Sequence, residues 1–264
     1  MNALAAAHPH DDVASTITTV FQAGWQDFLA RPTVAVFLIL VYPLVGLLLY
    51  RFAFDQELLP LLFPIASGFA LIGPLSAVGL FGISRNREQN REPEALQAFG
   101  ELTGDALVPT IKVGLLLLVI YAAWIGVAQL IYDLVMGGYV PGSLGDLAAT
   151  VLGSGAGWVL IVVGCGVGAL FALFALAVGA ISLPAIFDRR IDAGEAVGLS
   201  VSTVLGHPRL FLAWGIVVAV GLAIASLPAF LGLLVALPVF GHATWHLYRK
   251  TVPPAPAAPI TPRA

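Results

Sequence analysis

Six long apolar runs constrain this chain more than any other feature of its sequence. They lie at about 33–50, 60–83, 110–135, 158–187, 210–227 and 229–248. A helix needs about 20 apolar residues to cross the roughly 30 Å hydrocarbon core of a bilayer, and each run approaches or exceeds that length. Apolar residues make up 59% of the chain and charged residues only 10%, against about 45–50% and about 25% in soluble domains. The sequence therefore predicts an all-α polytopic membrane protein with six transmembrane helices.

Two of the runs are longer than one crossing needs. We expect the second and fourth runs to tilt, bend or project, with Pro64, Pro74 and Pro184 as places to bend. The fifth and sixth runs are separated only by "SLPAFLG". A hairpin explains their joint length better than one long kinked helix, which the sequence also allows.

The basic residues indicate the orientation of the chain, because cytoplasmic loops of membrane proteins are enriched in Lys and Arg. With a cytoplasmic N-terminus, Arg51 alone lies on the outer side. The cytoplasmic side then holds Arg31, Arg85, Arg87, Arg91, Lys112, Arg189, Arg190, Arg209, Arg249, Lys250 and Arg263. This asymmetry predicts a multi-pass membrane protein with both termini in the cytoplasm.

The ends of the chain and its longest connection differ from the apolar runs. Residues 1–12 contain Asp11 and Asp12 but no Lys or Arg, which is unlike a secretory signal peptide. We expect a disordered N-terminus at 1–12, a single six-span domain at 13–250 and a disordered Pro/Ala-rich tail at 251–264. Residues 137–157 have no Lys or Arg and are expected to form an external loop.

Each cytoplasmic stretch before an odd-numbered run has helical periodicity. The apolar positions are Val13, Ile17, Val20, Phe21, Trp25, Phe28 and Leu29, then Leu96, Phe99, Leu102 and Ala106, then Val197, Val201, Val204 and Leu205. One-sided periodicity of this kind is typical of amphipathic helices, and the spacing of Asp192 and Glu195 favours a helix start. Each stretch ends near a proline. We expect short cytoplasmic amphipathic helices, each followed by a pair of spans, in three parallel tandem repeats, although turn prolines and basic loops alone could produce this pattern.

Sequence motifs argue against catalysis. The chain has no Walker, GxSxG, HExxH or CxxC motif and no paired carboxylates at membrane depth. Its net charge of −3 argues against nucleic acid as a partner. The single cysteine, Cys165, is expected to be a small packing residue. We predict a protein that is not an enzyme and has no cofactor, with the lipid bilayer, a membrane-protein partner or another copy of itself as partner.

Four stretches carry a resemblance to a known family. They are "GWQDFLARP" (24–32), "FPIASGFALIGPLSAVGLFGISR" (63–85), "FALAVGAISLPAIFDR" (174–189) and "GHATWHLYR" (241–249). Together they resemble DUF2189, a bacterial family of predicted integral membrane proteins, over nearly the whole chain. The resemblance implies a six-span inner-membrane protein and carries no established activity.

His242 and His246 are the most conspicuous polar residues near a span end. Their spacing of four places both imidazoles on one helix face, where they could bind a metal ion or haem. Trp245 and Tyr248 flank them and Arg249 follows, which is the usual composition of a membrane-interface belt. We favour interfacial anchoring or polar packing for these histidines, with metal binding as the alternative.

Other candidate residues point to packing or transport. Gly164 and Gly168 belong to a small-residue stripe that predicts close packing of the fourth span. Gln129 and Asp133 form a polar pair expected to face inward near the external end of the third span. The scarcity of charge at membrane depth favours an accessory, scaffold or assembly protein over a carrier or channel for small solutes or apolar cargo. A metal- or haem-binding partner of a respiratory complex is the third hypothesis.

Overall fold

The computed structural model describes residues 12–31, 59–61, 69–91, 104–228 and 231–254. Within these ranges the chain is helical and contains no strand, so the all-α prediction is confirmed there. The elements are α1 (Val13–Ala30), η1 (Leu59–Leu61), α5 (Phe69–Glu88), η2 (Gly104–Ala106), α7 (Leu107–Met136), α8 (Leu144–Gly153), α9 (Gly155–Gly179), α10 (Ser182–Arg189), α11 (Ala193–Gly206), α12 (Pro208–Ser226) and α13 (Leu233–Thr251).

Three segments of the described chain are long and apolar enough to cross a membrane. They are Gly104–Met136, Gly155–Arg189 and Pro208–Ser226, which coincide with the third, fourth and fifth predicted runs. The first run, 33–50, lies outside the described residues, as do parts of the second and sixth. The count of six spans therefore stays a prediction.

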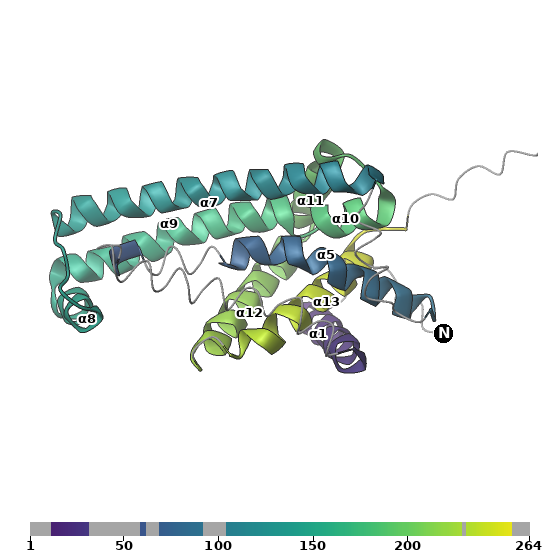
Figure 1. The fold of residues 1–264 in the computed structure, drawn as a ribbon, viewed down its shortest axis with the longest axis horizontal. Helices are drawn as coiled ribbons and strands as arrows, with labels where there is room; N and C mark the ends of the chain where they lie inside the picture. Colours follow the sequence, from purple (N-terminus) through teal and green to yellow (C-terminus); the bar gives the residue numbers. More distant parts are fainter. Residues whose placement is uncertain (1–11, 32–58, 62–68, 92–103, 229–230, 255–264) are drawn as a thin grey trace, which may run out of the picture.

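The helices α7 and α9 run side by side along the longest axis of the molecule (Figure 1). The 30 residues of α7 span about 45 Å, which exceeds the roughly 30 Å of a hydrocarbon core. Gly137 ends α7 with φ 62°, a left-handed conformation that suits glycine. Outward-facing side chains of this pair, such as Leu134, Val162 and Leu170, are large, apolar and exposed. This surface is suited to lipid.

The segment 137–157 is not only a loop, because it contains the ten-residue helix α8. Ser143 caps this helix by accepting a hydrogen bond from the backbone N–H of Asp146 at 3.1 Å. The Asp146 carboxylate in turn accepts a hydrogen bond from the Tyr139 hydroxyl at 2.6 Å. These local bonds satisfy the first turn of α8, a contribution that apolar periodicity does not predict.

A serine from α11 explains the break between α9 and α10. The Ser200 hydroxyl donates to the carbonyl oxygen of Ala177 at 2.7 Å and accepts from the backbone N–H of Ile181 at 3.2 Å. It therefore stands between the two groups that an uninterrupted helix would join directly, and such insertions bend helices. The expected bend of the fourth run is confirmed, and it occurs just before Pro184.

The predicted amphipathic stretch 13–29 is a helix, α1, but it is packed into the bundle. Its longest contact is with α13. A Cβ atom added to Gly24 would lie 2.6 Å from the backbone nitrogen of Ala243, so the two helix backbones touch. The face that α1 buries contains Thr16, Val20, Gly24, Asp27 and Phe28. Phe21, Trp25 and Leu29 stay exposed, so the predicted apolar face is divided between the bundle and the outside.

The third amphipathic stretch corresponds to α11. Asp192 caps this helix through its carboxylate, which accepts hydrogen bonds from the backbone N–H groups of Gly194 and Glu195 at 2.7 and 3.0 Å. The predicted start is thus confirmed. Ala196, Ser200 and Thr203 are buried, because small side chains allow close approach to α9 and α10. The second stretch, 96–106, lies mostly outside the described residues.

Candidate functional site

Buried and partly buried polar side chains gather where α1, α5, α10 and α13 meet. These helices lie toward one end of the molecule (Figure 1). We call this group the charged cluster. Its members are Asp27, Ser84, Arg87, Glu88, Asp188, Arg189, His242, His246, Tyr248 and Arg249. Each of these contacts joins two different helices, so the cluster depends on the tertiary fold.

Asp27 connects α1 to both α5 and α13. Its side chain is 7% exposed, and one carboxylate oxygen accepts a hydrogen bond from Arg87 Nη1 at 2.6 Å. The other oxygen lies 2.8 Å from His246 Nε2. Burial alone would raise the pKa of Asp27, but the hydrogen bond and charge of His246, helped by Ser84, lower it below the ordinary 3.8. Asp27 is therefore a stabilised anion inside the bundle.

Glu88 lies on the other side of the His246 ring. Its Oε1 is 3.8 Å from His246 Nδ1, and its Oε2 is 3.2 Å from Arg249 Nε. Burial raises the pKa of the Glu88 carboxyl above its ordinary 4.5, and the charge of Arg249 offsets this only in part. The pKa values of the two carboxylates that face His246 are thus shifted in opposite directions, downward for Asp27 and upward for Glu88.

His242 occupies the deepest part of the cluster. It is 1% exposed, and its Nδ1 lies 2.8 Å from the hydroxyl of Ser84 on α5. Its Nε2 is buried and has no hydrogen-bond partner among the described residues. His242 and His246 therefore share a face of α13, as their spacing predicts, but they contact different partners.

The C-terminal end of α13 is tied to α10. The Tyr248 hydroxyl donates to the Asp188 carboxylate at 2.8 Å and accepts from Arg189 Nε at 3.1 Å. Arg249 Nη1 lies 3.6 Å from the same Asp188 carboxylate. Because Arg249 also contacts Glu88, this half of the cluster is continuous with the half around His246.

Trp245 and Tyr248 lie inside the bundle, at 0% and 1% exposure. The Trp245 ring stacks on Phe81 and meets Phe187 edge-on, with both centroid distances 6.1 Å. Of the two roles predicted for these residues, interfacial or packing, their burial is that of packing. This end of α13 has the composition of an interface belt, but it is enclosed by α1, α5 and α10. A single sequence segment does not reveal that enclosure.

The surroundings of the two histidines are those of polar packing between helices. Within the described ranges, no group of three or more His, Cys, Asp or Glu side chains is arranged to hold one metal ion. Chemically, the charged cluster can hold helices together and can exchange protons with water through the partly exposed carboxyl of Glu88, whose side chain is 21% exposed.

The other predicted residues are scattered over the fold. Gln129 Nε2 donates to Asp133 Oδ1 at 2.8 Å, but Asp133 is exposed rather than inward-facing. Trp25 is 41% exposed on α1. A Cβ added to Gly168 would lie 3.0 Å from the Trp124 ring, while one added to Gly164 would meet nothing within 4 Å. The small-residue stripe therefore packs against α7 only in part.

Sequence reasoning missed the acidic members of the cluster. Asp27 lies between the apolar positions of α1, and Glu88 ends the basic stretch after the second run. A signal was present, because Gly24 and Asp27 follow Val20 at helical spacing and break the apolar face with one small and one charged residue. The α13 partner of Asp27, His246, is 219 positions away along the chain, so the pairing itself could not be read from the sequence.

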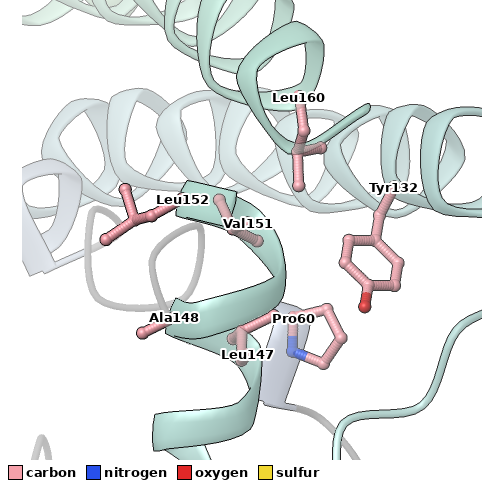
Figure 2. Close-up of a pocket in the computed structure, with 7 residues that line it drawn as sticks. All are labelled: Pro60, Tyr132, Leu147, Ala148, Val151, Leu152 and Leu160. Atoms are coloured by element: carbon pink, nitrogen blue, oxygen red, sulfur yellow. The ribbon is translucent and has the colours of Figure 1, made fainter. Parts of the chain in front are cut away.

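A separate pocket of about 330 Å³ lies between α8 and the ends of α7 and α9. Figure 2 shows Pro60 and Tyr132 on one side of it and four α8 side chains on the other. Those four are Leu147, Ala148, Val151 and Leu152. The Tyr132 hydroxyl already donates to the carbonyl oxygen of Tyr139 at 2.9 Å, so the pocket wall is apolar in character.

Comparison with known proteins adds one finding about identity. Neither the curated proteins nor the solved structures give a match to this chain. The family model matches residues 62–188, which is slightly less than half of the chain and does not reach the resembling stretches at 24–32 and 241–249. Over residues 62–188 the chain is similar to the family described as "predicted integral membrane protein (DUF2189)", which agrees with an integral membrane protein of apolar helices.

Proposed function

We propose that this protein is a non-catalytic accessory, scaffold or assembly factor of the bacterial inner membrane. The proposal rests on the buried polar groups, which bind groups on neighbouring helices. Asp27 of α1 binds both Arg87 of α5 and His246 of α13, and Ser84 binds His242. Polar groups paired in this way specify how helices are arranged, whereas a catalytic site needs groups directed at a substrate.

The proposed architecture has six spans in parallel tandem repeats, with both termini in the cytoplasm. Two features of α1 and α11 support it. The buried positions 20, 24 and 27 of α1 have the same spacing as 196, 200 and 203 of α11. Gly24 lies against the carbonyl of Val239 and the nitrogen of Ala243, and Ser200 contacts the equivalent pair, four residues apart, on the α9–α10 segment.

The ends of the two helices are alike as well. Their last residues are followed by Arg31 and His207, with backbone angles of φ −144°, ψ 56° and φ −130°, ψ 53°. Pro32 and Pro208 come next. Both pairs of elements thus combine a short helix, a turn before proline and a longer helix packed against a small side chain, as expected for copies of one unit.

The working surface in this proposal is the exposed apolar side of α1. Phe21, Trp25 and Leu29 are 37%, 41% and 56% exposed, while the opposite side is bound to α13. An apolar side that is held in place by a buried ion pair is suited to rest on a membrane surface or to bind a membrane-protein partner.

Co-purification from native membranes tests the proposal. A tagged chain with Phe21→Ala, Trp25→Ala and Leu29→Ala should lose a partner that the wild type retains, as judged by mass spectrometry. The matched control changes Gln22 and Gln26 to Ala, because both are exposed on the same helix. A wild type that recovers no partner and moves a solute in proteoliposomes would contradict the proposal and support the carrier or channel hypothesis.

The metal or haem hypothesis has its own measurement. Purified wild-type protein is analysed for metal and for a visible absorption band, and compared with the double variant His242→Gln, His246→Gln. A stoichiometric metal or haem that the double variant loses would overturn the scaffold proposal, because bound metal depends on imidazole ligands.

A further inference from the structure

The His246 ring lies between two carboxylates that come from different helices. Its Nε2 faces Asp27 of α1 at 2.8 Å, and its Nδ1 faces Glu88 of α5 at 3.8 Å. A neutral imidazole has one N–H, so it can direct a proton at only one of these two carboxylates. The other nitrogen would then present its lone pair to an anion. The distance of 3.8 Å to Glu88 is longer than a hydrogen bond, and among the described residues Nδ1 is buried without a hydrogen-bond partner. One additional proton, on His246 or on Glu88, would let this nitrogen and the Glu88 carboxyl satisfy each other.

We propose that Asp27, His246 and Glu88 form a proton-binding site that fastens α1 and α5 to α13. With the proton on His246, one ring N–H donates to Asp27 and the other to Glu88. With the proton on Glu88 instead, the Glu88 hydroxyl donates to Nδ1. In either form one imidazole joins three helices. When the proton is lost, the contact with Asp27 persists through Nε2, and the lone pair of Nδ1 repels the Glu88 carboxylate. The end of α5 then separates from α13.

Charged groups from four helices surround the site. The charged or titratable groups that face His246 or its neighbours are Asp27 from α1, Arg87 and Glu88 from α5, Asp188 and Arg189 from α10, and His242, Tyr248 and Arg249 from α13. Among these described residues, the ion pairs join three carboxylates to two guanidinium groups. Arg189, which donates to Tyr248 rather than to a carboxylate, is the third guanidinium of the cluster, so the proton count rests on the two carboxylates that face His246 and not on the net charge.

Burial makes the balance important. The side chains of Asp27 and His246 are each 7% exposed, so water screens their charges poorly and an uncompensated charge there is costly. Burial also raises the pKa of Glu88, which is consistent with a proton kept at this position.

Hydrogen exchange of the full-length protein in lipid nanodiscs tests the proposal. Exchange of residues 20–30 and 82–90 is measured at pH 6.0 and pH 8.5 and corrected for the intrinsic pH dependence of amide exchange. We expect opening in the wild type to increase about tenfold at the higher pH, the effect of one pKa unit of difference between the closed and open forms. Wild-type opening that does not change with pH would overturn the proposal.

Three variants separate the proton site from general packing. Glu88→Gln supplies an amide N–H to neutral Nδ1, so the helices should stay closed at both pH values. His246→Gln does not titrate, so its opening should be the same at both. His242→Gln is the matched control, because its Nδ1 faces Ser84 rather than a carboxylate, and it should keep the wild-type pH dependence.

The test does not require every variant to fold. If His246→Gln does not fold, wild type and Glu88→Gln decide the result between them. A Glu88→Gln protein with the full wild-type pH dependence would refute the site, and so would a loss of that dependence in His242→Gln alone.

Discussion

The contact between α1 and α13 leads to a sharp prediction for Gly24→Ala. A Cβ at position 24 would lie 2.6 Å from the nitrogen of Ala243, 2.7 Å from the carbonyl oxygen of Val239 and 2.8 Å from the Cβ of Ala243. Two of these atoms are backbone atoms of a helix, so they cannot rotate away. The alanine variant therefore has to displace α1 from α13 by roughly 1 Å to reach ordinary van der Waals distance.

The expected magnitude follows from three terms. Over-packing of a tight contact costs about 1–3 kcal/mol. Displacement of α1 also weakens the bond between Asp27 and His246, and a hydrogen bond to a charged group contributes about 1.5–3 kcal/mol. Replacement of glycine by alanine in a helix returns about 1 kcal/mol. We expect Gly24→Ala to lower the free energy of unfolding by about 2–4 kcal/mol.

The matched control is Gly198→Ala in α11. A Cβ at that position would have no heavy atom within 4 Å, so only the helix propensity changes. We expect this variant to be more stable than the wild type by up to about 1 kcal/mol. Both variants share the same chemical change and differ only in the space around the new methyl group.

The assay is equilibrium unfolding of the purified chain in mixed micelles, with increasing mole fractions of dodecyl sulfate. Circular dichroism follows helix content, and tryptophan fluorescence follows the buried Trp245 and Trp214. The reasoning would be refuted if Gly24→Ala were as stable as the wild type, or if Gly198→Ala were destabilised to the same extent. Either result would show that α1 does not touch α13 as described.

Three further predictions address the helix break, the acidic range and the topology. Ser200→Ala removes the hydroxyl that bonds Ala177 and Ile181 and should cost about 1–3 kcal/mol, whereas Ser202→Ala, at an exposed position, should change stability by less than about 0.5 kcal/mol in the same assay. The folded-state pKa of Asp27 is below its ordinary 3.8, so its stabilisation is present above that value and is lost as the pH falls through the folded-state pKa. Asp27→Asn should therefore lower the free energy of unfolding by about 3 kcal/mol at pH 7. In unfolding titrations its stability should decline less steeply than that of the wild type between pH 5 and 3. A decline as steep as that of the wild type would contradict this assignment. Reporter tags at either terminus should report cytoplasm and a tag within 140–150 periplasm, and labelling of both termini from outside intact spheroplasts would exclude this topology.

The sequence by itself determined the environment and the helical class of this protein. Apolar runs of the length of a bilayer leave a helix as the way to satisfy every backbone N–H and C=O in lipid, and the third, fourth and fifth runs are helices in the structure. Local rules were equally sufficient at Asp192, whose capping bonds join groups two and three residues apart. These features depend only on neighbours along the chain.

Only the tertiary structure decided what the polar residues do. His242 and His246 look like the edge of a membrane anchor when α13 is considered alone, because the flanking Trp245, Tyr248 and Arg249 have the composition of an interface. The fold encloses them with α1, α5 and α10. Their role depends on Asp27 and Ser84, which are 219 and 158 positions away. Burial converts an ordinary solvated charge into one that needs a specific partner, and that partner is chosen by the packing of distant helices, which no local pattern in the sequence encodes.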